Sequence, residues 1–521
     1  MIPNPGFTSG PGFSLQQNSQ YLPSDGATWV EIQPEPITPS DPNLQMARPS
    51  RPWRMYARVV GLVILVFFFE QIVAGAIIEA LNGDILFSSV CLAFSIPFLL
   101  AMVAMRRPRI ILLERAIPDP NGKVLHAITS HEGSLSTPMP TRMGRHLIRD
   151  DSILDVPTSK ASWILFTCTV LFSIILAILS AIGAYILVLP LLIPTILIGF
   201  SIPVMGWWSH STHQIGLPTR KRDAEAWLMA GMLSGLPAIV INSSIFPGII
   251  QFITPNISAD VLFALTVSIS APVGEEFCKG VAILFFANRI KSPKHGFQIG
   301  FTVGLGFAIV ENLMYISNAS VDPVALGFTT LIRGIGSIPG HAFWTSLTGA
   351  GIGWHLMQKR ANELHLKARD GQKISTPLSG DKNWKIFNPK TGIEIDSVQP
   401  EPGIQTLSSG VKVWLPPQAI GVKDPLLKIP LPKSPALGLL LAMLGHAFWN
   451  GSSIVVDFVA LQQGMGEIGR VILQLMWIVF LVIGVLLIGM GLLSSVRDAP
   501  DGAAVDSYQQ QLAEITNRIS R

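Results

Sequence analysis

Several ionisable side chains of this sequence lie inside long apolar runs, where a charge is costly and usually marks a functional site. The run SISAPVGEEFCKGVAILFF contains Glu275, Glu276 and Lys279. The three apolar runs that follow it contain further polar groups, namely Glu311 with Asn312, His341, and His446 with Asn450. Because each of these groups needs a partner away from water, we expect the four runs to bring them into one shared site.

The side-chain types in these runs limit the chemistry of such a site. Two imidazoles and a carboxylate are a common ligand set for a catalytic zinc ion that keeps one position open for water. A further carboxylate can act as a general base toward that water. One of Glu275 and Glu276 would be this base, while Lys279 would hold its neighbour ionised. A water-only mechanism without a metal would use the same residues.

The spacing of these residues assigns some of them to faces of a helix. Glu275 and Glu276 are adjacent and point about 100° apart, so both cannot face the same centre. His446 and Asn450 lie one turn apart and share a face. The Asn450 amide could donate to a developing oxyanion or orient the imidazole. A structural explanation also exists, since Glu275 and Lys279 could neutralise each other and a lone histidine could be an interhelical donor.

The composition places these side chains in a membrane protein. Hydrophobic residues make up 49% of the 521 residues and charged residues only 13%, which is about half the usual share of charge. Several apolar runs exceed the roughly 18 residues that can span a bilayer. The net charge of +4 is small for this length, so we expect the lipid bilayer and no nucleic acid as a partner. The three cysteines form neither a CxxC motif nor a disulfide framework.

The apolar runs predict an all-α fold, a polytopic transmembrane helix bundle with about ten spans. We place these spans at approximately 59–81, 84–105, 162–188, 190–208, 226–250, 261–287, 296–318, 324–355, 434–459 and 468–494. Lys and Arg residues gather before the first span and after every second span, whereas the alternate connections lack them. This alternation predicts that both termini are cytoplasmic.

Polar segments rich in Pro and Gly divide the bundle. The predicted organisation is a disordered polar N-terminal tail at 1–57, a transmembrane hairpin at 58–105, a cytoplasmic segment at 106–160, a transmembrane hairpin with a basic loop at 161–225, a catalytic membrane core at 226–355 and 434–459, a cytoplasmic insertion with a possible small β-rich part at 356–433, a last transmembrane span at 460–496 and a C-terminal tail at 497–521.

The pentapeptide GHAFW occurs twice, at 340–344 and at 445–449, in spans that we expect to run in opposite directions. If the repeat is real, two equivalent imidazoles approach one centre from antiparallel helices. This arrangement suits a ligand pair and also an inverted-repeat transporter. Arg333 precedes the first copy and is either the partner of an acidic residue or a sign that this long run is broken into two pieces.

These motifs together resemble the signature of the PrsW family of intramembrane proteases, which is similar to the CAAX prenyl endopeptidases and the bacteriocin-processing membrane proteins. The resemblance is carried, between roughly 226 and 460, by Glu275-Glu276-x-x-Lys279, Phe307-x-x-x-Glu311-Asn312, His341 followed by Gly349, and His446-x-x-x-Asn450. It implies that a glutamate-activated water hydrolyses a peptide bond of a membrane-anchored protein substrate. It also suggests a bacterial cytoplasmic membrane as the location.

The resemblance further implies individual roles. Glu275 or Glu276 would be the base, and Glu311, His341 and His446 would be metal ligands or polarising groups. Asn450 would be an oxyanion donor or an orienting group. The implied cofactor is a divalent metal, in the first place zinc.

Two other classes of function compete with hydrolysis. A proton-coupled transporter could relay protons through mid-membrane glutamates and histidines, and the GHAFW pair favours it slightly. A catalytically silent scaffold could bind a partner helix, but it would have to keep many ionisable groups at mid-depth. The adjacent glutamates and the amide one turn after His446 favour hydrolysis, because a proton relay has no need of that amide.

Overall fold

The computed structural model describes residues 51–105, 107, 110–128, 133–149, 154–217, 219–369 and 428–500, with short strands between 13 and 31 and between 386 and 415. The chain forms two compact units. The larger comprises Arg48–Arg106, Ile153–Ser379 and Trp384–Arg521, and the smaller Met1–Ala47, Arg107–Ser152 and Gly380–Asn383. The predicted C-terminal tail lies outside the described residues from 501 onward.

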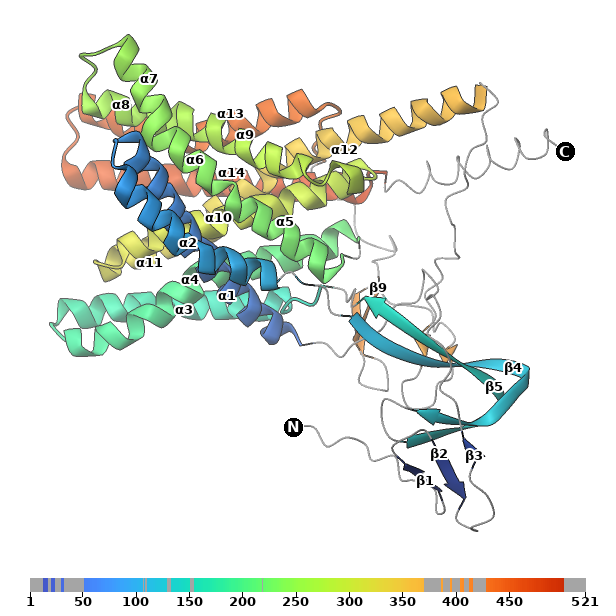
Figure 1. Cartoon of the computed structure of the whole chain (residues 1–521). Helices are drawn as coiled ribbons and strands as arrows, with labels where there is room; N and C mark the ends of the chain where they lie inside the picture. The colour runs from blue at the N-terminus through green and yellow to red at the C-terminus, as the bar shows by residue number, and fades with distance from the viewer. Residues whose placement is uncertain are drawn as a thin grey trace. The chain divides into compact units, whose positions relative to one another are not determined.

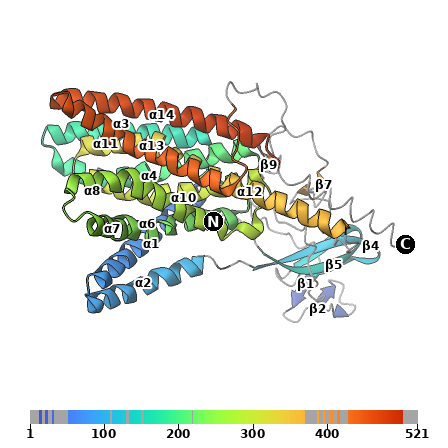
Figure 2. The ribbon, with the colours of Figure 1, turned by 90° about the horizontal axis from the view of Figure 1, so that it is seen from above.

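The larger unit is a bundle of long apolar helices (Figures 1 and 2). Its α-helices are α1 (Pro52–Leu81), α2 (Ile85–Met105), α3 (Ser159–Ala181), α4 (Tyr185–Ile215), α5 (Lys221–Leu233), α6 (Gly235–Val240), α7 (Phe246–Ile253), α8 (Ala259–Leu265), α9 (Ala271–Leu284), α10 (Pro293–Ala319), α11 (Pro323–Ile332), α12 (Ile338–Arg369), α13 (Pro435–Gln462) and α14 (Glu467–Arg497). In the described part of the chain, 8 helical stretches are long and apolar enough to cross a membrane.

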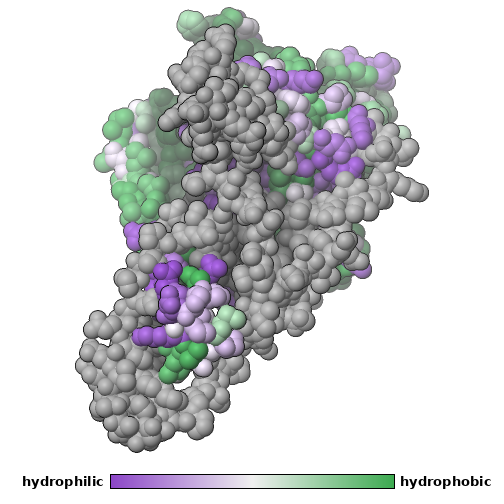
Figure 3. Space-filling view, turned by 90° about the vertical axis from the view of Figure 1, so that its right-hand side faces the viewer, coloured by the Kyte–Doolittle hydropathy of each residue, from purple (hydrophilic) through white to green (hydrophobic). Residues whose placement is uncertain are grey.

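The outer surface of these helices is apolar over much of its extent. Leu86, Phe252 and Ile468, on three different helices, are each more than three quarters exposed. Figure 3 shows polar side chains, coloured purple, at the end of the helices that faces the viewer, with apolar side chains, coloured green, behind and beside them. Apolar exposure on this scale requires lipid around the helices. The predicted class, an all-α polytopic membrane protein, is confirmed, whereas the count of ten spans and the side of the termini stay predictions.

Helix α10 lies at the centre of the bundle, because glycines let its neighbours approach to backbone contact. A Cβ atom at Gly304 would come 2.4 Å from the carbonyl oxygen of His341 in α12, and one at Gly306 would come 2.0 Å from that of Leu228 in α5. Gly349 packs in the same way against Gly296. These close crossings of small residues are typical of membrane helices, and they hold α5, α10 and α12 in register.

Helices α12 and α13, which carry the two copies of GHAFW, run antiparallel. Gly351 of α12 contacts the backbone of Ser434, while Gly445, further along α13, contacts the Trp344 ring. Contacts that move backward along α12 as they move forward along α13 define opposite directions. The prediction about the two copies of the repeat is therefore confirmed.

Three π-helical segments interrupt the helices close to the polar residues. They are η1 (Ile241–Ile245), η2 (Thr266–Ser270) and η4 (Arg333–Ser337), and a 3-10 turn, η3 (Ala287–Arg289), follows α9. Segments of this kind are frequent at functional sites, since the wide turn frees backbone groups and redirects side chains. Helix α11, η4 and α12 follow one another without a gap. The run that contains Arg333 is therefore continuous and is widened at η4 rather than broken.

The smaller unit contains β-structure that the sequence analysis did not predict. Strands β4 (Ile110–Ile128) and β5 (Gly133–Arg149) form a long antiparallel hairpin within the predicted segment 106–160. Strands β1 (Phe13–Gln16), β2 (Gln20–Pro23) and β3 (Val30–Glu31) form a small sheet inside the tail that its composition predicts to be disordered. The disorder of the remaining tail stays a prediction.

The predicted cytoplasmic insertion contains both helix and strand. Helix α12 continues past the predicted span to Arg369. Beyond it, β6 (Ile386–Phe387) pairs with β7 (Glu394–Ile395), and β8 (Gly403–Thr406) pairs with β9 (Lys412–Leu415), both antiparallel.

Candidate active site

The polar residues of four helices meet in the interior of the bundle. Helix α9 carries Glu275, Glu276 and Lys279, α10 carries Glu311, and α12 and α13 carry the two histidines. All of these side chains are buried except that of Glu311, which is partly buried. The structure therefore brings together the six ionisable residues that the sequence analysis singled out. Asn450, the uncharged residue predicted with them, lies apart.

Lys279 lies at the centre of this group and is fully buried. Its Nζ atom is 2.8 Å from Glu276 Oε1 and 3.6 Å from Glu275 Oε2. It also donates to Nδ1 of His341 over 2.9 Å and lies 3.7 Å from the ring centroid of Phe307. The shortest ion pair of Lys279 is thus with Glu276. The one-turn spacing had suggested Glu275 as its partner.

His446 lies between the two adjacent glutamates. Its Nδ1 is 3.2 Å from Glu276 Oε1, and its Nε2 is 3.9 Å from Glu275 Oε2. Trp344 stacks on the imidazole at a centroid distance of 4.8 Å and an interplanar angle of 13°. The two carboxylates diverge as expected, and each approaches a different nitrogen of one ring. When Nδ1–H donates to Glu276, Nε2 is left available as a ligand.

His341 has both of its ring nitrogens engaged. Its Nε2 is 2.7 Å from Glu311 Oε2, and its Nδ1 accepts from Lys279. Because an ammonium group can only donate, the proton of the neutral imidazole belongs on Nε2, the nitrogen nearest to Glu311. Arg333 lies 2.7 Å from the same Glu311 oxygen, so this arginine is the partner of an acidic residue.

Glu276 has a further partner that the sequence analysis missed. Thr345 Oγ1 donates to its Oε2 over 3.0 Å, so Glu276 accepts from Lys279, His446 and Thr345 while fully buried. Thr345 follows His341 by one helical turn, and this spacing was the available signal. A threonine in an apolar span does not stand out by itself, because its hydroxyl can bond to its own helix.

Glu275 is less well satisfied than its neighbour Glu276. Its Oε1 accepts from Asn242 Nδ2 at 3.4 Å, and the Asn242 carbonyl oxygen in turn accepts from Ser270 Oγ at 3.1 Å. Its Oε2 has no hydrogen-bond partner among the described residues. Asn242 belongs to a π-helical segment of another span, and no spacing in the sequence connects it with Glu275, whereas Ser270 ends the π-helical segment that directly precedes α9.

Three of these residues have the geometry of a metal site. One potential ligand atom from each of Glu275, His341 and His446 lies within 4.8 Å of the others, and all three residues are buried. Two imidazoles and a carboxylate match the donors that zinc prefers. Glu275 Oε2 and His446 Nε2 have no competing hydrogen bond, whereas His341 would have to exchange its contact with Lys279 or with Glu311 for the ion. The group could therefore bind a metal ion. Glu311, which the resemblance assigns as a ligand, is not a member of it.

Asn450 lies apart from the glutamates and histidines. Its Nδ2 donates over 3.2 Å to the carbonyl oxygen of Val267, inside the π-helical segment η2. The wide turn of η2 leaves backbone carbonyls without their regular helical partner, and Asn450 satisfies one of them. In this arrangement its amide supports η2, and its role toward an oxyanion or an imidazole stays a prediction.

One comparison with known proteins found a match to a family model. Residues 224–369 match the model of the PrsW family, described as a PrsW family intramembrane metalloprotease. The curated proteins and the solved structures contain no match to this chain. The matched region is shorter than the resemblance suggested and ends before α13, so His446 and Asn450 lie outside it. A relation to the CAAX prenyl endopeptidases or to the bacteriocin-processing proteins stays a prediction. The family match, on a bundle of apolar helices, supports an intramembrane protease.

Proposed function

We propose that the protein is an endopeptidase of the cytoplasmic membrane that hydrolyses a peptide bond of a membrane-anchored protein with the help of a divalent metal, in the first place zinc. The single observation that supports this most is the buried group of Glu275, His341 and His446. A second carboxylate, that of Glu311, lies 2.7 Å from one of these histidines. A ligand triad with a neighbouring base is what metal-assisted hydrolysis needs.

The contacts favour an assignment of roles that differs from the one drawn from sequence. Glu275, His341 and His446 would hold the ion, and Glu311 would be the base. When bound, zinc would lower the pKa of a coordinated water and polarise the scissile carbonyl. Glu276, through its contact with His446 Nδ1, would orient the imidazole rather than act on water.

The remaining residues would move protons and hold the histidines in place. Glu311 would take a proton from the attacking water, whose oxygen forms the new bond to the carbonyl carbon. As the carbon–nitrogen bond breaks, the same carboxyl group would return the proton to the leaving amine. Arg333, at 2.7 Å, provides the counter-charge for an ionised Glu311. Lys279 would fix Glu276 through its 2.8 Å contact.

A proton-coupled transporter is the second candidate, and one observation favours it. A chain of close contacts runs from Arg333 through Glu311, His341 and Lys279 to Glu276. Such a chain across several helices could relay protons. The family match supports hydrolysis instead, and the free oxygen of Glu275 lies beside this chain rather than within it.

Cleavage by the purified protein tests the proposal. A library of transmembrane-helix peptides is incubated with the wild type, with Glu275→Gln, and with the matched control Glu467→Gln at the exposed start of α14. We expect cleavage by the wild type and the control, and a loss of at least about 100-fold in Glu275→Gln. Undiminished cleavage by Glu275→Gln would contradict the proposed role of this residue. Proton flux in liposomes without any cleavage would favour the transporter.

A further inference from the structure

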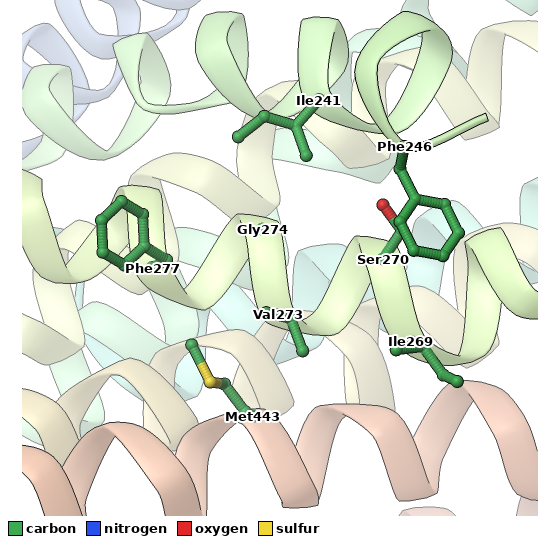
Figure 4. Close-up of a pocket in the computed structure, with 8 residues that line it drawn as sticks. All are labelled: Ile241, Phe246, Ile269, Ser270, Val273, Gly274, Phe277 and Met443. Atoms are coloured by element: carbon green, nitrogen blue, oxygen red, sulfur yellow. The ribbon is translucent and has the colours of Figure 1, made fainter. Parts of the chain in front are cut away.

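An apolar cavity lies beside the candidate active site (Figure 4). It has a volume of about 310 Å³ and is lined by side chains from three places in the chain. Ile241 and Phe246 come from η1 and α7, Val273 and Phe277 from α9, and Met443 from α13. In Figure 4, η1 and α7 form the upper wall and α13 the lower one, with η2 and α9 between them.

Each of the three chain segments that line the cavity also carries a residue of the candidate active site. Gly274 lines the cavity and directly precedes Glu275, and Ile241 directly precedes Asn242. Met443 lies three residues before His446, so the two share a face of α13. The cavity therefore borders two of the three proposed metal ligands.

A polar connection leads from the cavity to the unpartnered carboxylate oxygen. Ser270 lines the cavity, its hydroxyl donates to Asn242, and Asn242 donates to Glu275. Glu275 is more than nine-tenths buried, and its Oε2 has no hydrogen-bond partner among the described residues. A surface built only to face lipid has no need of this polar chain, because polar groups there are costly. The cavity is thus an apolar space that ends at a reactive group.

The cavity opens toward the membrane-facing side of α9. Val273 and Phe277, two of its lining residues, are 44% and 54% exposed. Its volume lies at the lower end of the roughly 300–1,000 Å³ typical of ligand pockets, which suits one or two side chains rather than a whole helix. A Cβ atom at Gly274 would come 3.1 Å from Ile241 Cγ2, so glycine here allows the two walls to approach each other closely.

We propose that this cavity is the specificity pocket of the enzyme, and that it receives a large aliphatic or aromatic side chain of the substrate next to the bond that is cleaved. The side chain enters laterally from a membrane-spanning substrate segment. Asn242 is a positioning residue, which holds Glu275 at the border of the pocket. This inference rests on the proposed function, and two experiments separate the failure of one from the failure of the other.

The first experiment changes the size of the pocket. Met443→Trp fills it and Met443→Ala enlarges it, while Met476→Trp on the exposed side of α14 is the matched control. Peptides that differ only in Leu, Phe or Ala at one position are cleaved in competition, and the products are identified by mass spectrometry. We expect Met443→Trp to lower cleavage next to Phe relative to Ala by about 10- to 200-fold, the range for a change of this size in an apolar pocket. Met443→Ala should favour Phe, and the control should match the wild type. Unchanged preferences in both Met443 variants would overturn the proposal.

The second experiment measures occupancy of the pocket without cleavage. The native cysteines, Cys91, Cys168 and Cys278, are replaced by Ala, and Met443→Cys is labelled with a small maleimide, with Met476→Cys as the control. A Phe-containing peptide should slow labelling at 443 at least about tenfold when it is present at ten times its Kd, an Ala peptide much less, and neither should affect 476.

The two measurements together show whether the pocket or the protease assignment has failed. Protection at 443 without any cleavage leaves the pocket in place and counts against the protease. Cleavage without protection, and with unchanged preferences, removes the pocket and leaves the protease. Protection by added phospholipid as strong as by the peptide would show that an acyl chain occupies the cavity, and would overturn the proposal.

Discussion

The imidazole rings of His341 and His446 lie with their centroids 4.7 Å apart, although the whole of the segment 356–433 separates them in the sequence. Both belong to copies of GHAFW, and the glycine of each copy makes room for the same ring. A Cβ atom at Gly340 or at Gly445 would come 2.8 Å from an atom of Trp344. The repeat therefore builds one aromatic wall, on which His446 stacks.

Trp344 should hold His446 in position without touching the substrate. Trp344→Ala removes the stacked ring and leaves a space into which the imidazole can turn. We expect a loss of about 10- to 100-fold in metal affinity or kcat, the usual effect of removing a group that orients a metal ligand. Trp344→Phe, which keeps an aromatic face, should recover most of it. The control is Trp53→Ala, at a half-exposed position of α1, and equal losses in Trp344→Ala and this control would contradict the role.

Lys279 should stabilise the fold as well as the site. Lys279→Met removes the fully buried cation and leaves the Glu276 carboxylate without its ion pair, and breaking a buried pair in this way costs about 3–5 kcal/mol. Adding Glu276→Gln removes the uncompensated charge, so the double variant should unfold at a higher temperature than Lys279→Met alone. Thermal unfolding in detergent measures both. A double variant less stable than Lys279→Met would show that the two residues do not act as a pair.

The close crossing of α10 and α12 should tolerate no side chain at Gly304. Gly304→Ala would bring a Cβ atom to 2.4 Å from the carbonyl oxygen of His341 and force the helices apart. We expect a destabilisation of about 1–3 kcal/mol together with a loss of cleavage, because His341 moves with α12. Gly484→Ala is the control, since nothing lies within 4 Å of a Cβ atom there. It should be neutral or stabilise α14 by up to about 1 kcal/mol. The same thermal unfolding assay compares the two, and no difference between them would argue against backbone contact.

The residues with ionisable side chains were predictable because their chemistry conflicts with their surroundings. Glu275, Glu276, His341 and His446 interrupt apolar runs, and the cost of burying them implies a common site. The helix class followed from the same runs, since only length and hydrophobicity are needed to recognise a membrane helix. The antiparallel pairing of α12 and α13 followed from the order of the spans.

The roles within the site were not predictable to the same degree. Asn242 and Thr345 are uncharged, so nothing in their own runs distinguishes them from residues that bond to their own helix. Asn450 shares a helix face with His446, but the π-helical turn of η2, which no spacing shows, offers its amide a nearer acceptor. The hairpin of β4 and β5 was missed because the analysis sought apolar runs, and this segment has few of them.

Metal content and cleavage, measured on the same purified samples of wild type, Glu275→Gln and Glu311→Gln, test the central claim most directly. The account predicts about one zinc ion in the wild type, none in Glu275→Gln, and a retained ion in Glu311→Gln. Both variants should lose cleavage, and a chelator should abolish wild-type cleavage until zinc is restored. A metal lost from Glu311→Gln but kept by Glu275→Gln would contradict the assignment of ligand and base. Cleavage that is indifferent to the chelator in a metal-free sample would contradict the role of the metal itself.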